Sequence, residues 1–328
     1  MSEMTETETP ESWEVAINYS ALLGTPPSSF SSAIRSLLLD EERNKGQLSP
    51  GVRAAVLRLM NSPSMRVSVH FAALELFPQK FAGQSELRSE ALIAPFRPFE
   101  LATLLGLVYL FRRARKLADP EEWALVQSGM VRAVELGALV GIAIPKIGFA
   151  TGMFAGGLHT LALITFHLHD RKGFKEYRRH LKSKALFFDG NYEMQRWGCT
   201  SPQVGGLLIQ NLGFGMTLAR AFAHSLIHRS SMASGGARAS EVTDSHRGFL
   251  VAFDWIDSLA KTGQPAETVH DARYYPLQAA REQLLSSVQQ LTTGAARVSW
   301  LAATKEDLPG AESSKVAGED AGPTEELE

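Results

Sequence analysis

A run of twenty residues, 147–166, contains no Asp, Glu, Lys or Arg. Its length alone would let a helix cross a bilayer. The run also holds four glycines, three threonines and His159, whereas a lipid-facing helix favours Leu, Ile and Phe. The mean hydropathy of the chain, −0.07, gives no support to a membrane protein. We therefore interpret the run as two buried elements of a soluble core, with glycines that allow close helix packing, and we expect no membrane span.

The rest of the sequence indicates a succession of amphipathic helices. Ser49-Pro50 and Ser201-Pro202 each place a capping hydroxyl before a proline, and Asp119-Pro120 is followed by two glutamates. Apolar residues at spacings of three and four follow these starts, and no sustained alternation of period two is seen. We predict an all-α, compact multi-helix fold. The expected helices span 33–39, 52–60, 69–77, 98–116, 120–134 and beyond, 148–168, 174–188, 202–212, 217–228, 246–261 and 275–292.

Charge is distributed unevenly over the 328 residues. Residues 1–16 carry a net charge of −5 and residues 305–328 a net charge of −6, which leaves about +9 on the interior. Both ends lack apolar periodicity, so they cannot offset the entropy cost of ordering, and we predict disordered acidic tails. A basic body could recruit an anionic partner, while the tails screen non-specific contacts; the plainer interpretation is that the tails only keep the protein soluble.

The chain carries one cysteine, Cys199, which cannot form an internal disulfide or build a thiolate metal site. The first residues are acidic and polar, unlike the basic and then apolar start of a signal peptide. Both features predict a cytoplasmic protein.

The strongest electrostatic feature is the stretch 171–184, which holds seven cations against Glu176, a net charge of +6. Phe174, Tyr177 and other apolar residues are interleaved with the cations. Such a segment suits an acidic protein face or a nucleic-acid backbone, but the same pattern describes a helix with a buried aromatic stripe and a solvated cationic face. The candidate partner-binding residues are Arg171, Lys172, Lys175, Arg178, Arg179 and Lys182, with Arg112, Arg113 and Arg115 from the 98–116 helix.

Three segments between about 130 and 225 resemble the HDOD domain, a non-catalytic bacterial relative of the HD-type metal phosphohydrolases. Residues 155–162, AGGLHTLA, resemble the family's AGLLHDIG helix. Glu193 followed by 197–205, WGCTSPQVG, resembles E…FGVDHAEVG, and 207–224 fits the next helices. Upstream, 58–63 resembles the RLANSA helix end. Residues 99–107 are similar to the family's EQALALLGL helix, and residues 69–76 are an alternative match for the same helix.

The resemblance implies a degenerate metal site. A working HD site needs a His, a His-Asp pair and a further Asp. Arg132 stands about where the first His would lie, Thr160 replaces the Asp after His159, and Ser201 replaces a later His. The resemblance therefore implies no catalytic residue, metal or other cofactor, and a helical recognition module of bacterial signalling.

The predicted organisation is a helical HDOD-like domain over 17–228, divided at about 125/126 into an N-terminal helical part and an HD-like core. A flexible loop, 229–245, and C-terminal helices, 246–304, packed on or beside the core, complete it. The favoured hypothesis is a signalling adaptor that binds a protein partner. The first alternative is a divergent metal-dependent phosphohydrolase or nucleotide-binding protein that would use His159, His167, His169 and Asp170. The second is a nucleic-acid-binding regulator. A nucleic acid or a cyclic nucleotide is thus the alternative to a protein partner.

Overall fold

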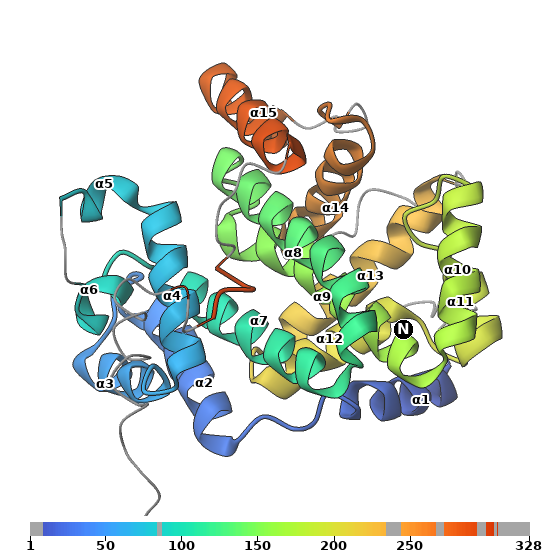
Figure 1. Cartoon of the computed structure of the whole chain (residues 1–328), viewed down its shortest axis with the longest axis horizontal. Coiled ribbons are helices and arrows are strands. Elements are labelled where there is room, and N and C mark those ends of the chain that lie inside the picture. The colour runs from blue at the N-terminus through green and yellow to red at the C-terminus, as the bar shows by residue number, and fades with distance from the viewer. Residues whose placement is uncertain are drawn as a thin grey trace, which may run out of the picture.

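The computed structural model describes residues 9–83, 87–233, 244–266, 272–293, 300–304 and 307 (Figure 1). No strand occurs among these residues, and the all-α fold is confirmed. The helices are α1 (Pro10–Ala21), α2 (Ser28–Arg43), α3 (Pro50–Leu59), α4 (Pro63–Leu76), α5 (Pro78–Phe81), α6 (Ser89–Ile93), α7 (Pro98–Leu117), α8 (Pro120–Ala143), α9 (Phe149–His169), α10 (Arg171–Ser183), α11 (Gly190–Trp197), α12 (Ser201–Leu212), α13 (Met216–Ala233), α14 (Asp244–Thr262), a 3₁₀ turn (Ala272–Tyr274) and α15 (Gln278–Thr293).

Helix α9 is the centre of the molecule and packs against α1, α7, α8, α10, α12 and α14. Figure 1 shows α2 to α6 grouped on one side of α7, and α10 and α11 at the opposite edge of the molecule. The uncharged run 147–166 forms this single helix after Gly148, which has a φ of +79°. The helix expected over 148–168 is thus confirmed, and the interpretation of the run as two elements is wrong.

Two described segments, Val126–Ala143 and Phe149–His169, are long and apolar enough to cross a membrane by length and composition. Within the protein, 83% of the second segment and 50% of the first are buried. The core helices of soluble proteins have the same apolar character, because other helices cover them on most sides.

Glycines set the close approach of α8 to α9, as the sequence predicted. A Cβ atom on Gly137 would lie 2.0 Å from the carbonyl oxygen of Gly152, and a Cβ on Gly152 would lie 2.0 Å from that of Gly137. A Cβ on Gly156 would lie 1.9 Å from the carbonyl oxygen of Ala133. The two backbones are therefore in direct contact, which no larger residue would permit at these positions.

The N-terminal end is more ordered than its composition suggests. Helix α1 begins at Pro10, and the Thr9 side chain caps it by accepting a hydrogen bond from the Ser12 backbone at 3.3 Å. Ala16 is fully buried against the core. The prediction of disorder is therefore wrong for residues 10–16, because Ser12 and Ala16 are buried where α9 and α12 cover α1. Residues 1–8 lie outside the described part.

The C-terminal helices pack on the same core. Helix α14 contacts α8, α9 and α13, and α15 contacts α8. Helix α13 continues to Ala233 and α14 begins at Asp244, whose carboxylate binds Lys146 Nζ at 2.9 Å. The predicted flexible loop 229–245 is therefore helical at both ends, and 234–243 lies outside the described residues. The predicted C-terminal tail also lies outside them, apart from Asp307.

Candidate functional site

A buried hydrogen-bond network joins the four helices α9, α10, α11 and α12. Glu193 in α11 is fully buried, and its Oε1 accepts hydrogen bonds from Tyr177 Oη at 2.7 Å and Ser201 Oγ at 2.9 Å. Its Oε2 accepts from the Ser201 backbone N–H at 2.5 Å. Ser201 Oγ also lies 3.4 Å from His159 Nδ1. The network therefore links α10, α11, α12 and α9 through one carboxyl group.

Helix ends place these groups. Asp189 caps α11, because its side chain accepts from the Tyr192 backbone at 3.0 Å. Gly198, with a φ of +73°, ends α11 in the left-handed conformation that favours glycine. Thr200 and Gln203 then form a capping box at the start of α12. The short turn between α11 and α12 brings the first backbone N–H of α12 onto Glu193.

Burial dominates the electrostatics of this network. Removal from solvent raises the pKa of Glu193 to about 8, although hydrogen bonds from Ser201 and Tyr177 favour the ionised form. When protonated, the carboxyl group can donate to Ser201 Oγ, and the Ser201 hydroxyl can then donate to His159 Nδ1. The two protonation states of Glu193 thus favour different directions of the same hydrogen bonds.

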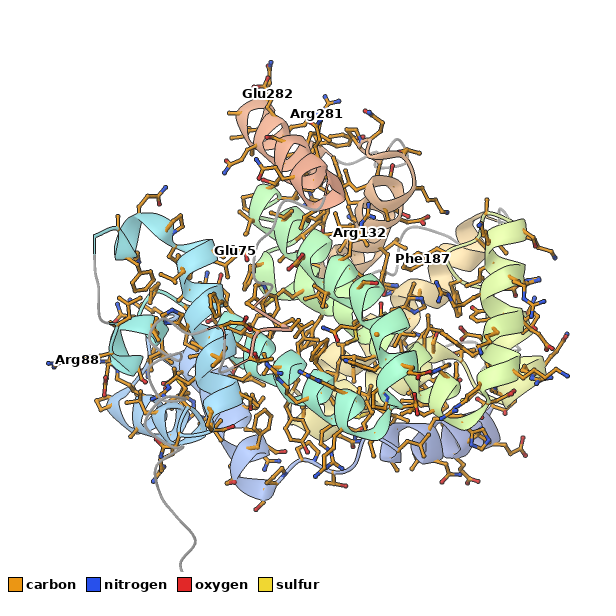
Figure 2. All side chains as sticks on the ribbon, in the orientation of Figure 1. Glu75, Arg88, Arg132, Phe187, Arg281 and Glu282 are labelled. Carbon is orange, nitrogen blue, oxygen red and sulfur yellow. The ribbon has the colours of Figure 1, made fainter. Side chains whose placement is uncertain are left out.

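His159 lies under an aromatic cover. Its ring centroid is 4.9 Å from that of Phe187, 6.2 Å from Phe188 and 6.4 Å from Phe253, and the residue is 4% exposed (Phe187 is labelled in Figure 2). Both oxygens of the neighbouring Glu193 already accept hydrogen bonds, from Tyr177 and from Ser201. One imidazole, one hydroxyl and three phenyl rings are not a donor set for a divalent metal. Within the described residues, no group of three or more His, Cys, Asp or Glu side chains could hold a metal ion.

The structure brings together only some of the predicted HD-site positions. His159 and Ser201 meet in the network, whereas Thr160 Oγ1 donates to the Gly156 carbonyl of its own helix at 3.1 Å. Arg132, labelled in Figure 2, is half-buried on α8. Tyr177 and Glu193 were not predicted as site residues. The one sequence signal for Glu193 was its place in the segment that resembles E…FGVDHAEVG.

The side chains of the alternative metal hypothesis do not converge. His159 and His167 are eight residues apart on α9, which is about 12 Å along the helix axis. The His167 ring packs on Phe174 at 5.0 Å and the His169 ring on Tyr19 at 5.1 Å. Each of these histidines therefore packs against a different neighbour, and the three rings do not face one common site.

The six basic residues predicted on 171–182 form one surface, which we name the cationic face of α10. All six are exposed, and at 100° per residue they fall within about 120° of the helix circumference. Phe174 and Tyr177 are buried on the opposite side. Nitrogen-tipped side chains project outward at this edge in Figure 2. The face consists of Arg171, Lys172, Lys175, Arg178, Arg179 and Lys182.

This arrangement of charge costs the fold stability. Arg171 and Lys172 lie in the first turn of α10, where the helix dipole disfavours cations. Like charges also repeat at a spacing of four residues, as in Lys175 and Arg179, and each such pair costs about 0.2–0.5 kcal/mol. Local helix stability therefore does not account for the cationic face.

The three candidate arginines of α7 play different parts. Arg112 donates a hydrogen bond to the Ala303 carbonyl, and Arg113 Nε donates to the Leu23 carbonyl at 2.9 Å. Arg115 is exposed. Arg112 and Arg113 thus attach other segments of the chain to α7, which their spacing in the sequence did not indicate.

Asp170 fixes the start of α10 and its position beside α11. Its Oδ1 accepts from the Gly173 backbone N–H at 2.9 Å, and its Oδ2 accepts from Arg196 Nε at 2.8 Å. We expect Asp170→Ala to lower the free energy of unfolding by about 1–2 kcal/mol, because the cap is lost. Asp170→Asn keeps the capping oxygen and should lose about 0.5 kcal/mol. Urea denaturation followed by circular dichroism measures both; equal losses would contradict the capping role.

No model of a known protein family, no curated protein and no solved structure matches the chain. The HDOD resemblance therefore rests on the sequence motifs alone. The cationic face and the buried network are the features of the structure from which a function can be inferred.

Proposed function

We propose that this protein is a non-catalytic, cytoplasmic regulatory adaptor of the HDOD type that binds an acidic protein partner along the cationic face of α10. The observation that carries the proposal is the exposure of six cations on one side of a single helix, in an order that weakens the isolated helix. A partner with complementary carboxylates would relieve that repulsion on binding.

The surroundings of the cations favour a protein over a nucleic acid. Binders of single-stranded nucleic acid combine basic grooves with exposed aromatic rings on which bases stack. The Phe and Tyr residues of the stretch 171–184, Phe174 and Tyr177, are buried instead. The cations from Arg171 to Lys182 extend over about 17 Å, the length of three turns of an acidic helix.

The state of His159 favours an adaptor over the divergent phosphohydrolase. A phosphate ester must reach the groups that act on it. His159 is 4% exposed beneath its aromatic neighbours, and Ser201 is fully buried. Ser201 is hydrogen-bonded to both His159 and Glu193, and this network suits a structural role that holds four helices together.

Capture of the partner from native lysate, with the full chain as bait, tests this proposal. The wild-type bait is compared with a variant bait that carries Arg178→Glu and Arg179→Glu. Mass spectrometry quantifies the proteins that each bait retains after nuclease treatment. We expect one protein enriched by the wild-type chain and reduced at least about tenfold by the reversal, because two repulsive charges replace two attractive ones. Retention should also fall as salt rises.

A matched control carries Arg53→Glu and Arg58→Glu, which reverse two exposed cations on α3. This variant should retain the partner as the wild type does. Equal loss in both variants would indicate a non-specific charge effect and contradict the proposal. Retention that survives the α10 reversal, or enrichment that nuclease removes, would overturn it as well.

A further inference from the structure

The segment after the described core carries the opposite charge to the cationic face. Residues 308–328 hold six acids against Lys315, a net charge of −5. Five of the acids fall within the last ten residues: Glu319, Asp320, Glu325, Glu326 and Glu328. The six acids are opposite in sign and equal in number to the six cations of the cationic face.

The structure shows where this segment leaves the fold. Arg112 on α7 binds the Ala303 carbonyl. Asp307 Oδ2 then accepts hydrogen bonds from the Thr304 backbone N–H at 2.7 Å and from Thr304 Oγ1 at 3.0 Å. Trp300 and Leu301 are buried in the core just before this turn. The described residues 300–304 are thus attached to the body, and Asp307 is hydrogen-bonded to Thr304 just before residues 308–328 in the sequence.

The segment is long enough to reach α10 from that point. Twenty-one residues span up to about 70 Å when extended. A domain of this size measures about 50 Å across. Because the segment is tethered to the molecule that carries the cationic face, its effective concentration at that face is in the millimolar range. Weak charge pairs are therefore enough for the segment to bind there.

The cationic face is a better counterpart than the basic residues nearer to the attachment point. Arg115 and Lys116 at the end of α7 are exposed, but they are two cations at the negative end of a helix dipole. The cationic face presents six, and two of these are at the positive end of α10. Attraction for a segment of net charge −5 is therefore stronger at α10.

From these observations we propose that residues 308–328 bind the cationic face of α10 in the same molecule and compete there with the acidic protein partner. The contact is a property of the isolated chain. Its regulatory consequence rests on the proposed function, because a partner must need the same six cations.

Zero-length cross-linking of the purified full chain with a carbodiimide tests the contact, because it joins a carboxylate to a lysine only when the two touch. Peptide mapping of the monomer follows residues 316–328, which trypsin releases as one fragment after Lys315. We expect this fragment to be linked to Lys172, Lys175 and Lys182 at least about fivefold more than to the exposed Lys45 and Lys116. The yield should fall at least about fivefold between about 20 mM and about 500 mM NaCl.

Two variants sharpen the result. Reversal of Arg178 and Arg179 to Glu should remove the links to α10, whereas reversal of Arg53 and Arg58 on α3 should leave them unchanged. Links spread evenly over all exposed lysines, links concentrated on Lys116, or links found only in a cross-linked dimer would each overturn the proposal.

Partner capture separates this proposal from the proposed function. The bait has its five terminal acids neutralised (Glu319→Gln, Asp320→Asn, Glu325→Gln, Glu326→Gln and Glu328→Gln). It should retain at least about threefold more partner, because competition at α10 is removed. Links to α10 without any partner captured would contradict the adaptor function alone. Capture that depends on α10, without links and without the threefold gain, would overturn the intramolecular contact alone.

Discussion

Gly152→Ala should lower the free energy of unfolding by about 3 kcal/mol, a large loss for a single added methyl group. The new Cβ atom would lie 2.0 Å from the carbonyl oxygen of Gly137. Backbone cannot rotate away as a side chain can, so α8 and α9 must move apart. Their separation would open the core around α9, which contacts α1, α7, α10, α12 and α14 as well.

Gly129→Ala is the matched control, because Gly129 lies in α8 and no atom is within 4 Å of an added Cβ. Alanine there should raise the free energy of unfolding by about 0.5–1 kcal/mol through its better helix propensity. Urea denaturation at pH 6, followed by circular dichroism, compares the two variants. A Gly152→Ala variant as stable as the wild type would show that α8 and α9 do not pack backbone to backbone.

Local sequence signals predicted much of this fold. Proline after a capping residue marked the starts of α3 and α8, and the helix expected over 98–116 is observed as Pro98–Leu117. At α12 the predicted cap, Ser201, is wrong by one residue, because Thr200 is the N-cap and Ser201 the first residue of the helix. These signals are reliable because the cap and the first turn involve residues that are neighbours in the sequence. The four glycines of the run 147–166 were also interpretable as sites of close helix packing, but the sequence did not indicate that α8 is the partner helix.

Contacts between distant segments were not predictable in the same way. The helix expected over 174–188 ends at Ser183, and Ala185 then adopts a φ of +52°. Nothing local to Tyr177 indicated that its hydroxyl would meet Glu193, and nothing local to Arg112 indicated that it would bind residue 303. Such pairs depend on how whole helices pack, which one sequence does not specify at the level of single side chains.

Glu193 should make the protein less stable as pH rises from about 5 to 8. The unfolded chain loses this proton near the ordinary value of 4.5, whereas burial raises the folded-state pKa to about 8. Between these values the folded state binds the extra proton, so each pH unit costs up to about 1.4 kcal/mol of stability. Above about pH 8 both states are ionised, and the loss is complete and constant. Urea denaturation at half-unit steps from pH 5 to 9 measures this slope.

Glu193→Gln isolates the contribution of this residue, because a neutral amide resembles the protonated carboxyl group and can donate to Ser201 Oγ. The difference in stability between the wild type and this variant cancels other titrations, such as that of His70, whose pKa is lowered by burial. We expect near-equal stability at pH 5 and a more stable variant at pH 9. A difference independent of pH would contradict a raised pKa.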